Sequence, residues 1–387
     1  MGVNSFNVFA VEYAKEQAFS SDPLTGYIAL RTEERPEIKT DLEILGDGLR
    51  RFKLAREKGV RGGKGGSFSL SVRLSGSGTA AGNGVPTEES ELSPLLLACG
   101  MKPVFMAHKA GSLVQSGGGG AVVNVSDGTG DNWAPGAGII SEKGEINFVQ
   151  SVDSGGDPDV ITCIKSWATQ PEPSEEIFNT RTLYPVNQAS ELGELETFSF
   201  RFHAPEFLLK LLGCCVADFS IKGNARNLIV VTLDLLFNDF EFAAPEDPAE
   251  LADLPPSLKA LGAPFFYDGV ETPVAGFEFK LGNIVNPISD INAPQGRSGW
   301  FIADRRPSLT LAAYYNAGHH SDWLNGDEIS AMLALGEMPG NIFGIYIPRG
   351  ETRIANRPER SGLVGEDLEI LPLESPLGNG DLFLSFG

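Results

Sequence analysis

Hydrophobic and polar residues alternate along residues 67–74. Phe68, Leu70, Val72 and Leu74 occupy every second position, with serines and one arginine between them. This period of two predicts an extended strand with one apolar and one polar face.

A short helix is predicted after this strand, over residues 93–99. Ser93 is placed to cap the first turn, Pro94 suits the first helical position, and Gly100 can end the helix. A similar unit recurs near the end of the chain, where an alternating run at 306–318 precedes a predicted helix over 327–336. The two copies lie about 240 residues apart, far more than the roughly 20 to 50 residues of a solenoid repeat, so two related domains are expected.

Further strands are predicted from alternating or β-rich runs at 121–125, 161–164, 182–184, 198–202, 215–224, 228–236, 276–283, 341–348, 368–373 and 381–386. The turn signal at 222–225 predicts that the runs before and after it pair in antiparallel fashion. The run at 228–236 is apolar on both faces, which indicates a central strand buried between layers. Residues 11–19 read as weakly helical.

These elements predict a mainly β fold with two β-sandwich or barrel-like domains, each with a flanking short helix and related by internal duplication. The first domain is expected at 1–240, including an N-terminal segment and a long insertion at about 104–170. The acidic, proline-rich stretch 241–264 is the expected linker, and 265–387 the expected second domain.

Composition agrees with a turn-rich β protein, since the 387 residues include 46 glycines and 25 prolines. Thirty basic against 51 acidic residues give a formal net charge of -21, which argues against a protein that wraps DNA. An acidic surface still permits weak, sliding contact with DNA.

The sequence has no run of about 20 apolar residues and no signal-peptide pattern at its start, so neither membrane insertion nor signal-peptide export is expected. Its four cysteines, Cys99, Cys163, Cys214 and Cys215, form no CxxC pair. They are interpreted as reduced, mostly buried thiols of a cytoplasmic protein.

A basic stretch between residues 50 and 64 stands out in this acidic chain. It contains Arg50, Arg51, Lys53, Arg56, Lys58, Arg61 and Lys64. One interpretation is an arm that contacts an adjacent subunit or ring, and the other is a solvated hairpin. Nucleic acid is the weaker third option, because only one aromatic residue, Phe52, lies among these cations, and base stacking draws on several.

No catalytic constellation emerges from the sequence, and we expect no enzyme activity, cofactor or metal. Ser154-Gly155-Gly156 resembles a serine-protease nucleophile loop, but no histidine lies in a matching context. His319 and His320 are adjacent and lack the i, i+4 spacing of zinc enzymes, so a turn is expected there. Phosphate-binding and dinucleotide-binding glycine patterns are absent. The 51 carboxylates offer many possible glycosidase pairs, and no spacing in the sequence singles one out.

The order of these pieces resembles the major tail tube proteins of long-tailed, siphovirus-like bacteriophages. The matching segments are 65–100, 182–238 with its 220–225 turn, and 276–348 with Leu281-Gly282-Asn283, Asp304-Arg305-Arg306-Pro307 and Gly340-Asn341. The resemblance implies a structural virion protein whose inner sheet joins those of its neighbours into rings. The rings stack into a hollow tube for delivery of DNA into the host cell.

The internal repeat favours trimeric rings with pseudo-sixfold symmetry, and hexameric rings are the alternative. The resemblance also implies a tape measure protein, a tail terminator and distal tail proteins as partners, with DNA passing through the lumen without specific binding. It places the protein in the virion tail, assembled in the host cytoplasm. A tail terminator, a head-tail connector, and a β-rich phage adhesin or carbohydrate-active protein are the alternative functions.

Overall fold

The computed structural model describes residues 10–34, 36–45, 60–76, 92–104, 111–186, 193–251, 255–338, 340–360, 362–375 and 380–387. The fold is mainly β, as predicted, and the described residues contain two short α-helices.

The first half of the chain contains β1 (Ala10–Lys15), β2 (Ile28–Leu30), β3 (Glu37–Leu45), β4 (Val60–Arg73), α1 (Ser93–Ala98), β13 (Phe198–His203), β14 (Leu208–Asn224), β15 (Val230–Phe237) and β16 (Asp239–Ala243). Between α1 and β13 lie β5 (Met101–Pro103), β6 (Ser112–Leu113), β7 (Val122–Val125), a 3-10 turn (Gly130–Asn132), β8 (Gly138–Ser141), β9 (Ile146–Asp153), β10 (Asp159–Cys163), β11 (Glu176–Asn179) and β12 (Arg181–Pro185). The second half of the chain contains β17 (Phe265–Tyr267), β18 (Val270–Glu271), β19 (Val274–Lys280), β20 (Asn283–Ser289), β21 (Arg297–Arg305), β22 (Ser308–Tyr314), α2 (Ala317–Asn325), β23 (Glu328–Met338), β24 (Asn341–Asn356), β25 (Glu359–Arg360), β26 (Leu363–Pro372) and β27 (Phe383–Phe386).

The same pattern of strand pairing occurs twice in the chain. In the first half the hydrogen-bonded order is β3–β4–β15–β14–β13–β1–β2, and β16 also pairs with β14. In the second half it is β19–β22–β26–β24–β23–β17–β18, and β27 also pairs with β24. Two antiparallel strand pairs connect the halves into a single sheet: β14 pairs with β19, and β12 pairs with β27.

The registers repeat as well as the order. Ile38 pairs with Phe68 in the first half, and Phe279 pairs with Leu309 in the second, so both numbers rise by 241. The strand β13 has a register shift between Phe198 and Phe200, and β23 has one at the corresponding place after Ile329. A bulge is a local backbone feature that strand order does not require, so its recurrence is a second, separate similarity between the halves.

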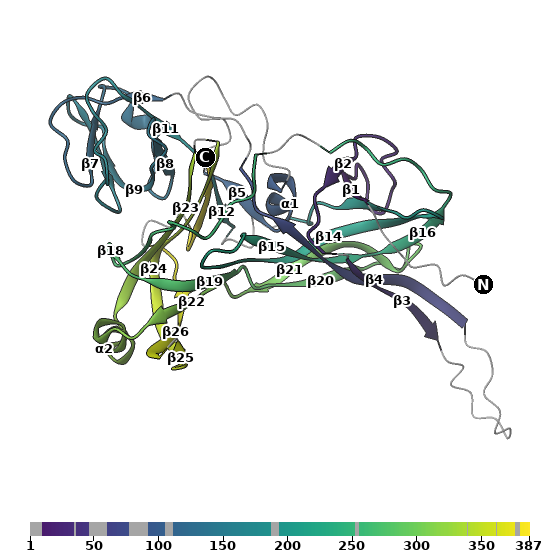
Figure 1. Cartoon of the computed structure of the whole chain (residues 1–387). Coiled ribbons are helices and arrows are strands. Elements are labelled where there is room, and N and C mark those ends of the chain that lie inside the picture. Colours follow the sequence, from purple (N-terminus) through teal and green to yellow (C-terminus); the bar gives the residue numbers. More distant parts are fainter. Residues whose placement is uncertain are drawn as a thin grey trace.

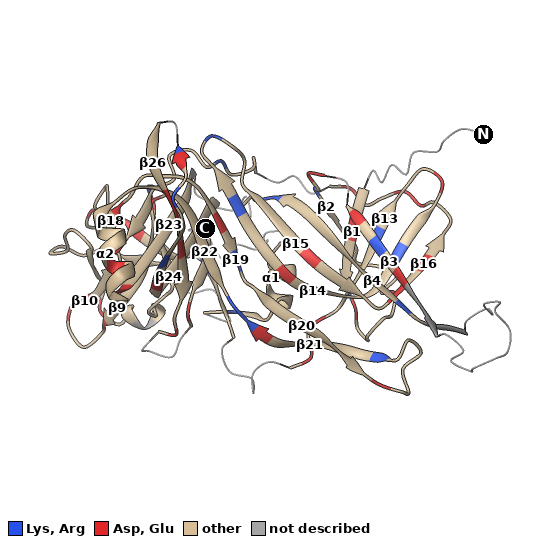
Figure 2. Ribbon diagram, turned by 90° about the horizontal axis from the view of Figure 1, so that it is seen from below, with Lys and Arg blue, Asp and Glu red and all other residues tan. Residues whose placement is uncertain are grey.

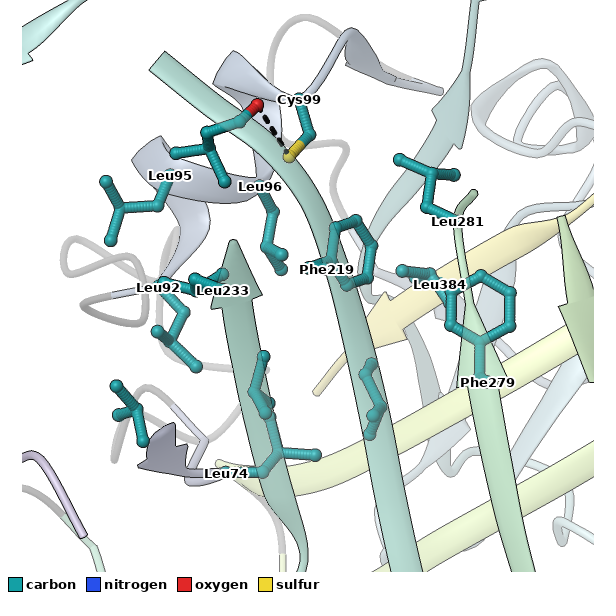
Figure 3. Packing of buried hydrophobic residues seen from close by; sticks show 14 of the residues in the cluster. Leu74, Leu92, Leu95, Leu96, Cys99, Phe219, Leu233, Phe279, Leu281 and Leu384 are labelled. Carbon is teal, nitrogen blue, oxygen red and sulfur yellow. Dashed lines mark hydrogen bonds between the residues drawn. The ribbon is translucent and has the colours of Figure 1, made fainter. Parts of the chain in front are cut away.

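The main core lies between the apolar face of this long sheet and the elements that cover it. Leu95, Leu96 and Cys99 from the α1 region share one buried cluster with Phe219 of β14 and Leu233 of β15. Figure 3 shows these side chains together, with the Cys99 thiol 3.4 Å from the carbonyl oxygen of Val216. All four cysteines are buried free thiols, as the sequence analysis expected.

The segment between β5 and β12 forms a separate unit, at the upper left of Figure 1. Its six strands follow the order β6-β11-β8-β9-β10-β7, and a bridge between Val114 and Val125 brings the ends of this sheet together. The result is a small, nearly closed barrel with its own core, which includes Trp133 and Trp167.

The barrel contacts the second half of the chain through apolar side chains. Phe148 is fully buried, and its ring lies 5.1 Å from the ring of Tyr346 on β24. A side chain at Gly344 would meet the Phe148 ring at 2.9 Å, so glycine permits this close approach. Residues that are distant in sequence thus form one apolar interface, which contains Ile140, Ile146, Met332, Ile342 and Phe383.

Several sequence predictions need correction. The run predicted as a helix at 327–336 instead forms most of β23, in which Ile329, Ala331, Leu333 and Leu335 pack in the main core and Met332 and Ala334 pack on the opposite face against the barrel. This strand is paired on both sides, with β17 and β24, and these tertiary contacts override the helix-favouring composition of the run. The helix occurs earlier, at α2, between an Asn316 N-cap and a left-handed Gly326 C-cap.

Two smaller predictions also differ from the structure. The weakly helical stretch 11–19 instead contains β1, which pairs with β13 and β2. Helix α1 forms where predicted, but Ser93 lies inside the helix and its buried hydroxyl makes no capping bond. Leu92 precedes the helix and provides no side-chain cap, so the burial of Leu95 and Leu96 holds the helix in place.

Candidate functional site

One face of the long sheet carries polar side chains on neighbouring strands of both halves. On β4, Ser69 and Ser71 alternate with the buried Phe68, Leu70 and Val72. The register places Thr232 of β15, Ser220 of β14, Lys280 of β19 and Ser308 of β22 in the row that begins at Ser71. The alternation predicted for 67–74 therefore belongs to a continuous polar surface. Figure 2 shows acidic and basic positions interspersed along these strands.

Acidic residues outnumber basic ones on this polar face. By strand register its acids are Glu37, Asp41, Asp218, Asp234, Glu278, Glu351, Asp367 and Glu369, and its bases are Lys39, Arg73, Lys222, Lys280 and Arg353. Two of the lysines share one acid, since Lys222 and Lys280 lie 3.7 Å and 3.1 Å from Glu278. These cations are partly neutralised within the sheet.

The neighbouring strand β15 has the same alternation as β4. On β15, Val231, Leu233 and Leu235 are buried, but Asp234 on the opposite face is exposed and accepts a 2.6 Å hydrogen bond from Ser69. The strand is central, but it is not buried on both faces as predicted.

On β13, by contrast, the polar face is closed. Ser199 is fully buried and donates to Glu16 Oε1 at 2.7 Å, and Thr197 donates to Glu16 Oε2 at 2.8 Å. The polar face of this strand is therefore not exposed to solvent, because Glu16, just after β1, covers it.

The β14–β19 junction is a five-residue antiparallel ladder from Ser220–Lys280 to Asn224–Gly276. Asp218 continues it, accepting backbone N–H groups from Gly282 at 2.8 Å and Asn283 at 3.3 Å. Burial raises the pKa of Asp218 above its ordinary value, the two backbone donors oppose this shift, and the Asp234 carboxylate adds to it.

Two strand edges that correspond to this junction remain unpaired in the part of the chain that the structure describes. Beyond Glu351, β24 pairs with β26 alone up to its last residue, Asn356, which corresponds by register to Ser220, where the pairing of β14 with β19 begins. Strand β3 pairs only with β4 among the described residues, whereas β19 has β14 on its other side. An unpaired edge of this kind is a template for pairing with another chain.

The structure describes only part of the predicted basic contact. Arg50, Arg51, Lys53, Arg56 and Lys58 lie outside the described residues, and Arg61 lies on β4 with a side chain outside them. Lys64 is described, and its ammonium lies 3.0 Å from Asp239 and 5.4 Å from the centre of the Phe240 ring. With 39% of its side chain exposed, Lys64 is partly used within its own chain.

The hairpin β20–β21 was not predicted from the sequence, which indicated only a strand at 276–283 in this region. Its tip lies beside Lys64 of the β3–β4 hairpin. The Gln295 side chain accepts a hydrogen bond from the Lys64 backbone N–H at 2.9 Å and donates one to the Asp239 carboxylate at 3.1 Å. The turn-forming residues 290–296, which include proline and glycine, are the signal that could have revealed it.

The histidines considered for chemistry have structural surroundings. His319 lies on α2, not in the expected turn, and is buried with its Nδ1 atom 3.4 Å from Glu366 and its ring 4.6 Å from that of Tyr267. Within the described ranges, no group of three or more His, Cys, Asp or Glu side chains is placed to hold a metal ion. Neither of the helices described in the structure has the length and hydrophobicity to span a membrane.

The fold and its unpaired edges define a β-sandwich structural protein with surfaces suited to self-association. Residues 10–369 match the family described as phage tail tube protein. The chain therefore belongs to this family, and it is a structural component of the phage tail tube. The terminator, connector, adhesin and carbohydrate-active alternatives are not favoured. No curated protein matches the chain.

Proposed function

We propose that this protein is the major tube subunit of a long-tailed, siphovirus-like phage, and that it polymerises as stacked rings into the conduit for DNA. Family membership supports the tube, and the observation that carries the ring is the β14–β19 junction. That junction joins two similar units within one chain, and the edges β24 and β3 could join chains in the same way.

The proposed units are an internal duplication. The first covers 1–240 and carries the insertion at about 104–170, the second covers 265–387, and 241–264 links them. Recurrence of strand order, register and the β13/β23 bulge supports this division. In the second unit α2 leads directly into β23, and in the first the barrel lies between α1 and β13.

A chain with two units supplies two of six positions in a ring. The free edge of β24 beyond Glu351 would pair with β3 of the next chain, as β14 pairs with β19. Three copies then close a ring with pseudo-sixfold symmetry, and closure removes the exposed edges. Hexameric rings of whole chains are the alternative.

The polar face of the sheet is the proposed lumen wall. Its excess of acids repels a polyanion, and the pairing of Lys222 and Lys280 with Glu278 leaves those cations less available to grip phosphates. DNA would pass without specific binding. The role proposed here is assembly and conduction, with no catalytic step.

The basic stretch from Arg50 to Lys64 is proposed to contact an adjacent subunit or ring. Its charge is opposite to that of the chain as a whole, which favours docking on a neighbour. Replacing Arg50, Arg51 and Lys53 by glutamate should stop tube growth, and replacing the same residues by lysine or arginine is the matched control. Tubes formed normally by the glutamate variant would rule out this contact.

Other partners are proposed from the resemblance to the family: a tape measure protein, a tail terminator and distal tail proteins. Assembly would take place in the host cytoplasm before the tube becomes part of the virion.

Electron microscopy of the purified protein, under conditions that promote and prevent polymerisation, tests the proposal. Hollow tubes and rings with threefold symmetry beneath a sixfold outline are expected. Strict sixfold rings would favour six chains, and persistent monomers would reject self-assembly of the chain alone.

A further inference from the structure

An exposed isoleucine projects from the tip of the β20–β21 hairpin. Ile291 is 98% exposed, the highest value among the large hydrophobic side chains described. The tip is ordered by its own hydrogen bonds: the Asp290 N–H donates to Gly296 O at 3.0 Å, and the Asn292 N–H donates to the Asp290 carboxylate at 2.8 Å. The isoleucine is therefore presented to solvent by a well-formed turn.

The hairpin is also anchored to the body of the protein. Trp300 is buried, and its indole N–H donates to Gly213 O at 2.9 Å. Near the tip, Gln295 bonds to Lys64 and Asp239 as described above. Because these bonds order the tip before any partner binds, docking of Ile291 would cost little conformational entropy.

An apolar groove lies at the opposite end of the sheet. It has a volume of about 550 Å³ and small apolar lining residues that include Ala260, Ala263, Pro264, Pro273 and Ala275. Leu261, at the same groove, is 65% exposed. The groove is large enough for an isoleucine side chain, and its lining has the matching chemistry.

The groove and the tip lie at opposite ends of β15. Arg226, just before β15, lines the groove, and Asp239, just after β15, bonds to Gln295 near the tip. The eight residues of β15 span about 26 Å at roughly 3.3 Å per residue. Figure 1 likewise shows the β14–β15 turn near β19 on the left, and the β20–β21 hairpin extending to the right.

Complementary features at opposite ends of a molecule make a head-to-tail contact, which propagates instead of closing. We propose that Ile291 of each subunit enters the groove around Leu261 of a subunit in the next ring. This inference rests on the proposed function, because it requires stacked rings. It names the side chain and the receiving surface for one contact between rings.

Replacing Ile291 by aspartate tests the contact without disturbing the core, because the side chain is almost fully exposed. Rings should form as in the wild type, and the protein concentration needed for tubes should rise roughly tenfold or more, since burial of one isoleucine is lost at each contact. Leu113→Asp, which changes an exposed apolar residue on the barrel, is the matched control and should leave tubes intact. Combining Ile291→Asp with Leu261→Lys should restore tube growth.

A double-cysteine variant gives a second readout. All four native cysteines are buried, so Ile291→Cys together with Leu261→Cys should form disulfides between rings and give a ladder of linked chains on a non-reducing gel. Either single variant should give no ladder. If the wild type and Ile291→Asp both form normal tubes and the double-cysteine variant gives no ladder, this inference alone is overturned. If the wild type forms no tubes at all, the result counts against the proposed function.

Discussion

Replacing Thr40 by proline tests which strand edge closes the ring. Thr40 is an exposed residue of β3 that follows the Lys39–Ser67 pair, just as Leu281 follows the corresponding Lys280–Ser308 pair. The Leu281 N–H donates across the internal junction to Phe219 O at 3.1 Å. By this correspondence the Thr40 N–H faces the unpaired edge, and proline would remove it.

The size of the effect follows from the internal junction, which pairs five residues on each strand. A net contribution of about 1 kcal/mol per backbone hydrogen bond gives about 5 kcal/mol for the ladder before the cost of association. One lost bond at each of three junctions would cost about 3 kcal/mol per ring, which lowers the ring-formation constant more than a hundredfold. Displacement of the neighbouring strand by the proline ring adds to this loss.

The assay is mass photometry or sedimentation over a range of protein concentrations. Wild-type protein should shift from the 41.3 kDa monomer to a species of three chains, and Thr40→Pro should remain monomeric at concentrations where the wild type is assembled. Thr40→Val keeps the backbone donor and is the control, and unchanged circular dichroism would show that the proline is tolerated at this edge. Ring formation by Thr40→Pro at the wild-type concentration would refute the proposed edge pairing.

Three further changes test other parts of the structure. Phe148→Ala opens a cavity between the barrel and Tyr346, so it should lower the free energy of unfolding by about 3 to 5 kcal/mol. Hydrogen exchange should increase in the barrel and around Tyr346. Unchanged exchange would contradict this interface. Trp300→Phe should cost about 1 kcal/mol in thermal unfolding, because it removes the bond to Gly213, and no loss would show that the hairpin is held otherwise. The melting temperature of the Asp218→Asn variant should rise relative to that of the wild type as the pH increases from acid to neutral. The raised pKa of Asp218 means that the folded state favours the protonated carboxyl, so this group disfavours folding above its folded pKa; a flat difference in melting temperature across pH would contradict the shift.

The periodicity of the sequence was sufficient to place many of the strands. Alternation at 67–74 lies within β4, and the turn signal at 222–225 lies where β14 and β15 form their antiparallel pair. These features are local, because alternation with a period of two depends only on which side of one strand is buried. The charge excess is likewise a property of the sequence alone, and acids outnumber bases on the polar sheet face.

Local pattern failed where burial came from distant residues. At 327–336 the composition favours a helix, but pairing with β17 and β24 makes the segment a strand. Ser199 reads as solvent-facing, yet Glu16, 183 residues earlier, accepts its hydrogen bond inside the protein. Neither partner can be recognised from the segment itself.

The sequence by itself therefore determined the β-rich class and the acidic character of the chain. Only the tertiary structure decided that β14 joins the halves, that the barrel rests on β24, and that β3 and β24 present unpaired edges in the described chain. The physical reason is that alternation fixes how a strand faces the core, whereas its partners are chosen by packing and backbone hydrogen bonds among segments hundreds of residues apart.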